Sequence, residues 1–121
     1  LAPCPRVQAD AARGLPFGAV FDRILVDAPC TGTGTLARNP EIRWRVTPEE
    51  ILRQSQRQEA ILRHALACLK PGGRLVYSTC SLEPEENEEV VRRAASGRVK
   101  RTVLRLPGRD PGDGFFAAVI D

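Results

Sequence analysis

The stretch 21-FDRILVDAPCTGTG-34 joins an apolar run to a turn that contains a cysteine and two glycines. Its contiguous Ile-Leu-Val at 24–26 is typical of a strand buried on both faces of a parallel sheet. A second apolar run, 74-RLVYSTC-80, also ends on a cysteine. A cysteine that only packs is not expected at either strand end, so the pattern raises the question of what Cys30 and Cys80 do.

The segment between the two runs predicts a loop and then a helix. Residues 28–47 form the loop, and a loop of this length inside a compact domain is usually functional. The residues 47-TPEE-50 are typical of a helix start with Thr47 as its cap, and 70-KPGG-73 is expected to end the helix. Its apolar face is expected at positions 51, 52, 62, 65, 66 and 69. Strand, helix and strand in this order predict a parallel pair with a right-handed crossover.

The flanking segments complete an α/β pattern. Residues 6–10 predict a short strand that ends on an aspartate. A second helix is expected to begin near Pro84 and to continue through 85-EENEEVVRRAA-95, with acids first and arginines last as the helix dipole favours. Residues 99–106 and 114–120 predict two strands whose short connection implies an antiparallel hairpin.

The composition is that of a soluble globular chain of one domain at most. The 121 residues are 42% hydrophobic and 27% charged, which is ordinary for this class. The sequence has neither a run of the roughly 18 apolar residues that cross a membrane nor a signal segment, so we expect no membrane partner and a cytoplasmic location. The net charge is +3, and sixteen of the 18 basic residues are arginine. This permits a nucleic-acid partner but carries little weight alone.

The cysteines argue against a metal site. No pair has C-x-x-C spacing, and His64 is the only histidine, so zinc is not expected. Cys68 precedes the end of the long helix and is expected in the core. His64, in the middle of that helix, is expected to be structural or exposed and not catalytic. The sequence around Cys4 does not indicate a role for this cysteine. In the cytosol the thiols would stay reduced.

Cys30 and Cys80 are expected to meet at one edge of the sheet. Ligands bind beyond the carboxyl ends of parallel strands in open α/β sheets. Because neighbouring strands are about 4.8 Å apart, two thiols at matching ends can face one small substrate. Pro29 stiffens the turn, and Gly32 and Gly34 allow a ligand to approach the backbone. A single cysteine at a strand end favours packing, whereas the pair favours catalysis.

In the stretches 22–44, 72–91 and 112–120, together with 9-ADA-11, the chain resembles the RNA cytosine-C5 methyltransferase family, and within it most resembles the bacterial enzymes of small-subunit ribosomal RNA. The resemblance implies an α/β, Rossmann-like class I S-adenosylmethionine-dependent fold without its first two strands and its glycine-rich turn. Residues 1–121 are therefore expected to be the carboxyl-terminal part of a catalytic domain, and the absence of any methionine agrees with a piece of a longer protein.

The resemblance also implies roles for individual residues. Cys80 would add to carbon 6 of cytosine, so that carbon 5 can accept a methyl group from S-adenosylmethionine, and Cys30 would help to remove the carbon-5 proton. Asp27 would bind the base and contribute to the cofactor site. Asp10 would hold the cofactor adenine, although a turn aspartate at a strand end is an equal alternative.

Further residues are candidates for contact with RNA. The expected substrate contacts are Pro29, Arg38, Arg43 and Arg45, although exposed arginines are often only solvated surface. Trp44 is expected to pack rather than to stack on a base. The glutamates Glu85, Glu86 and Glu88 are expected to stabilise a helix start and to have no chemical role.

Several functions compete. The first is methyl transfer to cytosine in RNA, with ribosomal RNA as the substrate, by a parent protein of which this piece alone is inactive. The second is a catalytically inactive RNA-binding or assembly fragment. A thiol redox protein is disfavoured because C-x-x-C is absent, and DNA is less favoured because both cysteine motifs are present. The free edge of such a half-sheet predicts self-association.

Overall fold

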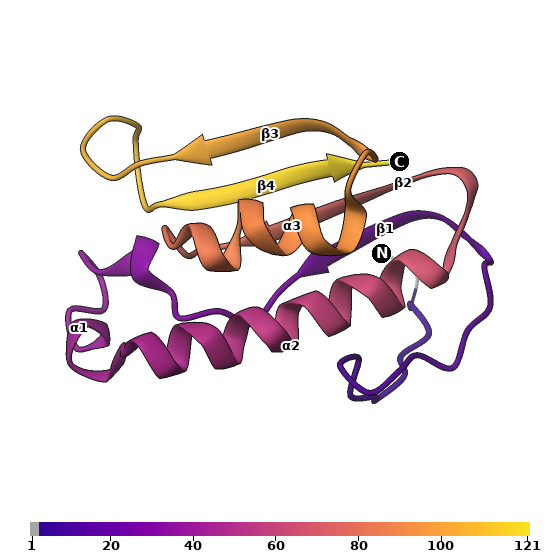
Figure 1. The fold of residues 1–121 in the computed structure, drawn as a ribbon, viewed down its shortest axis with the longest axis horizontal. Coiled ribbons are helices and arrows are strands. Elements are labelled where there is room, and N and C mark those ends of the chain that lie inside the picture. Colours follow the sequence, from indigo (N-terminus) through magenta and orange to yellow (C-terminus); the bar gives the residue numbers. More distant parts are fainter. Residues whose placement is uncertain (1–2) are drawn as a thin grey trace.

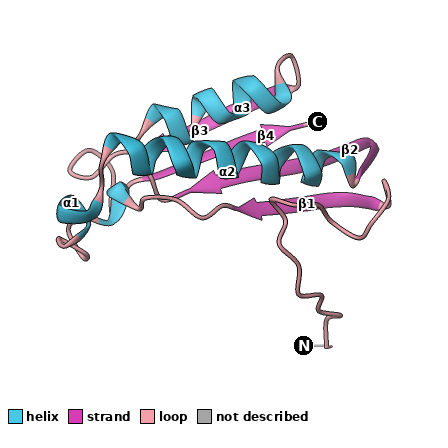
Figure 2. Cartoon of the chain, turned by 60° about the horizontal axis from the view of Figure 1, so that its bottom comes forward, coloured by secondary structure: helices cyan, strands magenta, loops and turns pink. Residues whose placement is uncertain are grey.

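A computed structural model describes residues 3–121 and places two helices over one face of a four-stranded sheet (Figures 1 and 2). The strands are β1 (Phe21–Asp27), β2 (Leu69–Thr79), β3 (Val99–Arg105) and β4 (Phe115–Ile120). The α-helices are α1 (Ile42–Arg45), α2 (Pro48–Ala67) and α3 (Glu88–Ala95), and the 3-10 helices are η1 (Thr33–Thr35) and η2 (Pro84–Glu86).

The sheet has the order β1-β2-β4-β3. The strands β1 and β2 are parallel, as predicted, and α2 forms the connection between them. The strands β3 and β4 form the predicted antiparallel hairpin, and β4 inserts beside β2, where Tyr77 is opposite Ala118. The predicted α/β fold, a parallel pair followed by an antiparallel hairpin, is therefore confirmed.

The core lies between the sheet and the helices α2 and α3. The fully buried Leu62 from α2 and Val90 from α3 pack against Leu75, Tyr77 and Phe116 of the sheet. The rings of Tyr77 and Phe116 meet edge to face, with centroids 6.5 Å apart, a geometry that aromatic pairs prefer.

The prediction that β1 is buried on both faces is wrong. Val26 is buried, but its neighbour Leu25 is 70% exposed. Successive side chains of a strand point to opposite faces, and the helices cover only one of them (Figure 2). In addition, β1 is an edge strand. The apolar run was therefore a correct signal for a strand and a poor signal for its burial.

The helix α2 begins as predicted, because the Glu50 amide donates to the Thr47 hydroxyl over 3.1 Å. Its end differs: α2 stops at Ala67, and residues 70–73 belong to β2. Leu52 is 57% exposed, contrary to the predicted apolar face. In this half of α2 the buried side chains are instead the polar Ser55 and Gln58.

Residues 6–10 are not the predicted strand. They are exposed and form no ladder with the sheet. Asp10 opens a turn instead: its carboxylate accepts from the Ala12 amide over 3.0 Å, and its carbonyl accepts from Arg13. A strand is stabilised by cross-strand partners, which this segment does not have within residues 3–121.

Candidate functional site

The ends of β1 and β2 bring two thiols together. The strands pair in register up to Asp27 and Ser78, so the residues that follow them leave the sheet at the same edge. The sulfur of Cys30 lies 3.3 Å from that of Cys80. The predicted meeting of the two cysteines at this edge is therefore present in the structure.

Gly34, in the loop after Cys30, links the two cysteine segments through backbone hydrogen bonds. The Gly34 amide donates to the Cys80 carbonyl over 2.8 Å, and the Gly34 carbonyl accepts from the Gly114 amide over 2.7 Å. A Cβ atom on Gly34 would lie 2.6 Å from the Cys80 carbonyl oxygen and 2.5 Å from that of Gly114. Gly34 was predicted to admit a ligand, but the space beside it is filled by protein backbone.

Hydroxyl groups add a second set of bonds between these segments. The Thr33 hydroxyl accepts from the Leu82 amide over 2.9 Å and lies 3.4 Å from the Ser81 hydroxyl. Both Thr33 and Ser81 are buried. The loop after β1 and the loop after β2 therefore form one hydrogen-bonded unit around the thiols.

Glu86 was predicted to stabilise a helix start, but its side chain lies in the protein interior. It lies in η2, before α3 begins, and is fully buried. Its carboxylate accepts from the Thr31 amide over 2.9 Å, from the Thr31 hydroxyl over 2.6 Å, from the Gln58 amide group over 3.0 Å and from the Ser81 hydroxyl. Sequence reasoning missed Glu86 and Gln58. The available signal was the repeated hydroxyl residues in both cysteine motifs, which need an acceptor when buried.

The Cys30 thiol holds its proton more tightly than a free cysteine does. Burial, the hydrogen bond to Cys80 and the charge of Cys80 together raise the pKa of the Cys30 thiol from 9.0 to about 12. Desolvation disfavours a thiolate, and so does a second thiolate nearby. Cys30 therefore keeps its proton at neutral pH.

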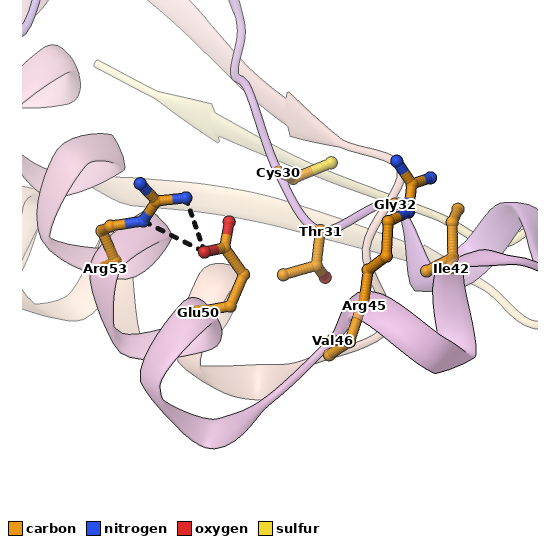
Figure 3. A pocket seen from close by; sticks show the side chains of 8 residues that line it. All are labelled: Cys30, Thr31, Gly32, Ile42, Arg45, Val46, Glu50 and Arg53. Atoms are coloured by element: carbon orange, nitrogen blue, oxygen red, sulfur yellow. Dashed lines mark hydrogen bonds and ion pairs between the residues drawn. The ribbon is translucent and has the colours of Figure 1, made fainter.

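A cavity of about 490 Å³ opens beside Cys30 (Figure 3). Its volume is within the range of roughly 300–1,000 Å³ that is common for small-molecule sites. The lining residues are Cys30, Thr31, Gly32, Ile42, Arg45, Val46, Glu50 and Arg53. Glu50 accepts from Gln54 and Arg53, and these bonds lower the pKa of its carboxyl group. Glu50 therefore stays charged and paired with Arg53, and Arg45, which also lines the cavity, lies 3.8 Å from the carboxylate of Glu41.

The predicted cofactor-binding residues, Asp10 and Asp27, have different surroundings. Asp27 is exposed at the end of β1 and accepts from the Ser78 hydroxyl over 3.2 Å. Asp10 and Pro29 line a second cavity, of about 550 Å³, together with Arg57 and Ile61. The structure therefore brings Asp10 close to the cysteine motif, although the segment that carries it is not a strand.

The predicted RNA contacts lie around α1. Arg38 forms an ion pair of 2.6 Å with Asp113. The Arg43 guanidinium lies 4.7 Å above the ring of Trp44, which is 77% exposed. The prediction that Trp44 packs is wrong, because α1 is a single turn that buries only Ile42.

The other sequence predictions concern structural residues. Cys68 is buried in the core, as expected. The Nδ1 atom of His64 lies 2.8 Å from the Ala11 carbonyl oxygen, which agrees with a structural role. Within residues 3–121, no helix is long and apolar enough to cross a membrane, and no group of three or more acidic, histidine or cysteine side chains could hold a metal ion.

Comparison with known proteins gives concordant matches. The family described as "16S rRNA methyltransferase RsmB/F" matches residues 6–106. The chain is 44% identical over 111 residues to ribosomal RNA small subunit methyltransferase B of Enterobacter sp. (strain 638), and 42% identical over 113 residues to that of Vibrio vulnificus (strain YJ016). These alignments cover 83% and 85% of this chain and 26% of each relative, so the chain spans about a quarter of their length.

Solved structures agree with the fold. The crystal structure of NSun6 from Pyrococcus horikoshii with SFG is 32% identical and has a TM-score of 0.79 over 94% of this chain and 33% of that one. A methyltransferase homologue from the same organism is 36% identical, with a TM-score of 0.66 over 83% of this chain and 38% of that one.

Proposed function

This chain belongs to the 16S rRNA methyltransferase RsmB/F family, and we propose that the protein carrying it methylates carbon 5 of cytosine in ribosomal RNA through a covalent cysteine adduct. The observation that carries the proposal is the 3.3 Å contact between the sulfurs of Cys30 and Cys80 at the carboxyl edge of two parallel strands. The relatives are ribosomal RNA methyltransferases by name, and a cytoplasmic enzyme accords with such a substrate.

The chemistry requires a nucleophile and a base. Cys80 as a thiolate adds to carbon 6 of cytosine, which makes carbon 5 nucleophilic. Cys30 keeps its proton at neutral pH, so Cys30 does not compete as the nucleophile, and its thiol lies 3.3 Å from the attacking sulfur. S-adenosylmethionine supplies the methyl group when it is bound.

Cys30 would act after the adduct has formed. Burial remains the main cause of the raised pKa of Cys30, but once Cys80 is bonded to carbon 6 its sulfur carries no charge, and the smaller repulsive contribution of Cys80 is lost. Cys30 can then release its own proton to solvent and, as a thiolate, take the proton from carbon 5. The electrons of that C–H bond form the C5–C6 double bond, and the Cys80 thiolate leaves.

A second cavity supports a site for one end of S-adenosylmethionine. It measures about 550 Å³, and Asp10, Pro29 and Ile61 are among the residues that line it. A carboxylate can accept from an adenine amino group, and the apolar surfaces can cover a ring. Asp10 would hold the adenine, and Asp27, exposed at the end of β1, would face the cofactor and the base. SFG, an analogue of S-adenosylmethionine, bound to the NSun6 neighbour supports this cofactor.

Unpaired RNA would approach across α1. An exposed indole with a guanidinium over it, as in Trp44 and Arg43, offers a surface on which a base can stack. The target cytosine must leave its stack to reach a thiol in a cavity. Arg38 and Arg45 would contact phosphates, and Pro29 would border the base.

A trapping experiment tests the proposal. The full-length protein is incubated with S-adenosylmethionine and 16S rRNA fragments that contain 5-fluorocytidine, whose fluorine cannot be removed as a proton. We expect an RNA–protein adduct that survives denaturant and that Cys80→Ala abolishes. With unmodified RNA, Cys30→Ala should accumulate the same adduct, because elimination is blocked. Methyl transfer that persists in Cys80→Ala would overturn the proposal.

The alternative is an RNA-binding or assembly part without catalysis. Retained RNA affinity with neither an adduct nor methyl transfer would support this alternative.

A further inference from the structure

We propose that Glu86 is a positioning residue that holds the Cys30 and Cys80 segments in the arrangement in which their sulfurs touch. Its catalytic meaning rests on the proposed function, but its effect on the thiols can be measured without methyl transfer.

The donors to Glu86 come from both cysteine segments. Thr31 directly follows Cys30 and donates twice, from its amide over 2.9 Å and its hydroxyl over 2.6 Å. Ser81 directly follows Cys80 and donates from its hydroxyl. One carboxylate therefore fixes the residue after each thiol, in loops separated by fifty residues of sequence.

The helix α2 supplies a third point of attachment. The Gln58 side-chain amide donates to Glu86 over 3.0 Å and to the Pro29 carbonyl over 2.7 Å. Pro29 directly precedes Cys30. The residues on both sides of Cys30 are thus bonded to a network that has Glu86 at its centre.

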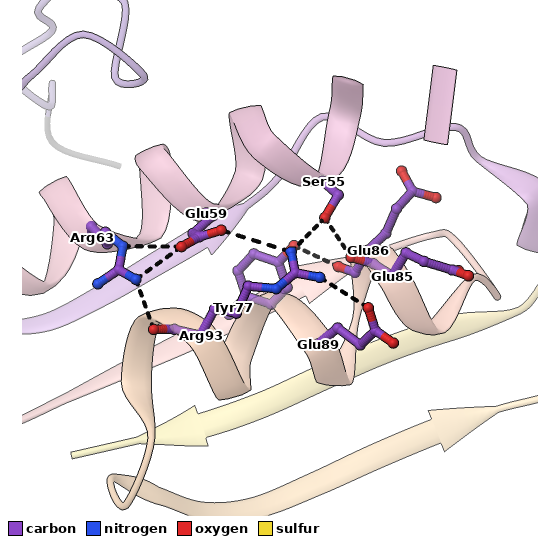
Figure 4. Close-up of polar contacts among 8 residues, drawn as sticks. All are labelled: Ser55, Glu59, Arg63, Tyr77, Glu85, Glu86, Glu89 and Arg93. Atoms are coloured by element: carbon purple, nitrogen blue, oxygen red, sulfur yellow. Dashed lines mark hydrogen bonds and ion pairs between the residues drawn. The ribbon is translucent and has the colours of Figure 1, made fainter. Parts of the chain in front are cut away.

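Glu86 is itself anchored through its backbone (Figure 4). The Tyr77 hydroxyl donates to the Glu86 carbonyl over 2.8 Å, and the Ser55 hydroxyl donates to the Glu85 carbonyl over 2.8 Å. Burial raises the pKa of Tyr77, so its hydroxyl remains a donor. Asn87 adds contacts with Thr79 and with the Ser81 carbonyl. The backbone that carries the Glu86 carboxylate is therefore bonded to both β2 and α2.

The buried carboxylate of Glu86 is not needed merely to fill the core. A buried carboxylate is costly unless charged or polar donors compensate it, and among the ion pairs of the described residues none involves Glu86. An apolar side chain could fill the same volume without this cost. Convergent donors from three segments do something that an apolar side chain cannot: they specify the distance between the segments.

The test uses formation of a disulfide as a measure of thiol contact. Diamide, the oxidant, takes two hydrogens and two electrons from the Cys30 and Cys80 thiols and becomes the hydrazine, while the sulfurs form one bond. Trypsin then releases residues 24–38 joined to residues 75–92, which mass spectrometry distinguishes from peptides with Cys4 or Cys68. The rate is measured under native conditions for the full chain and its variants.

We expect Glu86→Ala to slow this disulfide by about tenfold, since a preorganised contact is lost. Glu86→Gln should recover much of the rate, because its oxygen still accepts and the Thr31 and Ser81 hydroxyls can turn to accept from its amide. The matched control is Glu85→Ala, whose side chain is exposed on the same short helix and which should react like the wild type.

Thermal unfolding separates positioning from stability. A purely structural residue would lower the melting temperature and leave the rate in the folded protein unchanged, and that result for Glu86→Ala would overturn the proposal. If Glu86→Ala does not fold, Ser81→Ala removes one donor and should slow the disulfide by a smaller factor. A wild-type rate in both Ser81→Ala and Thr31→Val would equally overturn it. Neither result bears on the adduct experiment, so the two proposals fail separately.

Discussion

The sulfur of Cys30 lies 3.3 Å from the sulfur of Cys80, although fifty residues separate them in the chain. Parallel pairing of β1 with β2 brings their ends to one edge, and a glycine, buried hydroxyls and a buried glutamate join the loops that follow. The thiol pair is thus a property of the contacts between two loops, and those contacts can be altered one at a time.

Gly34→Ala should destabilise the protein by roughly 1–3 kcal/mol, the usual effect of overpacking. The added Cβ would lie 2.6 Å or less from two backbone carbonyl oxygens, those of Cys80 and Gly114. Urea denaturation measures the change. Gly18→Ala is the control, because a Cβ there meets nothing within 4 Å. Equal stability of the two variants would contradict the contact at Gly34.

Ionisation of Cys30 should weaken the fold at high pH. Because its pKa is raised from 9.0 to about 12, the folded state holds the proton more tightly than the unfolded state. The stability from this group is fully present below pH 9 and is lost as pH rises toward about 12. The free energy of unfolding should therefore fall less steeply in this window for Cys30→Ser. If the free energy of unfolding fell equally steeply with pH in the wild type and in Cys30→Ser, the raised pKa of Cys30 would be contradicted.

Removal of the Asp10 carboxylate should weaken binding of S-adenosylmethionine by about tenfold or more, since a hydrogen bond to a charged group contributes roughly 1.5–3 kcal/mol. Isothermal titration calorimetry of the full-length protein with Asp10→Ala measures it. Asp22→Ala, on the exposed part of β1, should bind like the wild type. Identical affinities for both variants would remove Asp10 from the cofactor site.

Trp44→Ala should weaken binding of single-stranded RNA by about 1–3 kcal/mol, the contribution of one stacked base. Trp44 is the only tryptophan, so quenching of its fluorescence reports binding directly in the wild type. Fluorescence anisotropy of labelled RNA compares the variants, and Trp44→Phe should retain most of the affinity. An unchanged affinity in Trp44→Ala would show that RNA does not stack there.

Self-association should depend on the uncovered side of β1. Leu25 on this edge strand is 70% exposed, and Phe21 at the start of the same strand is 38% exposed. An exposed apolar edge strand favours pairing with another chain. Sedimentation velocity of the 121-residue chain should show concentration-dependent association that Leu25→Arg reduces. Leu52→Arg on α2 is the control, and an equal effect of both changes would argue against this edge.

Local signals predicted much of the fold. The Thr47 cap, the apolar run of β1 and the short turn of the hairpin each act over a few residues, and each was found where it was expected. The order strand, helix, strand then implied a parallel pair. Parallel pairing alone predicted that Cys30 and Cys80 lie at the same edge of the sheet.

The exposure of Leu25 and Trp44 and the burial of Glu86 depended on segments far away in the chain. No local pattern states which face of a sheet its helices will cover, or that hydroxyl groups fifty residues apart share one carboxylate. Backbone hydrogen bonds and steric preferences are local, so the amino-acid sequence was sufficient to predict the helices and strands. Burial and the network around the thiols arise when distant segments pack together, because solvent exclusion and convergent hydrogen bonds depend on that packing.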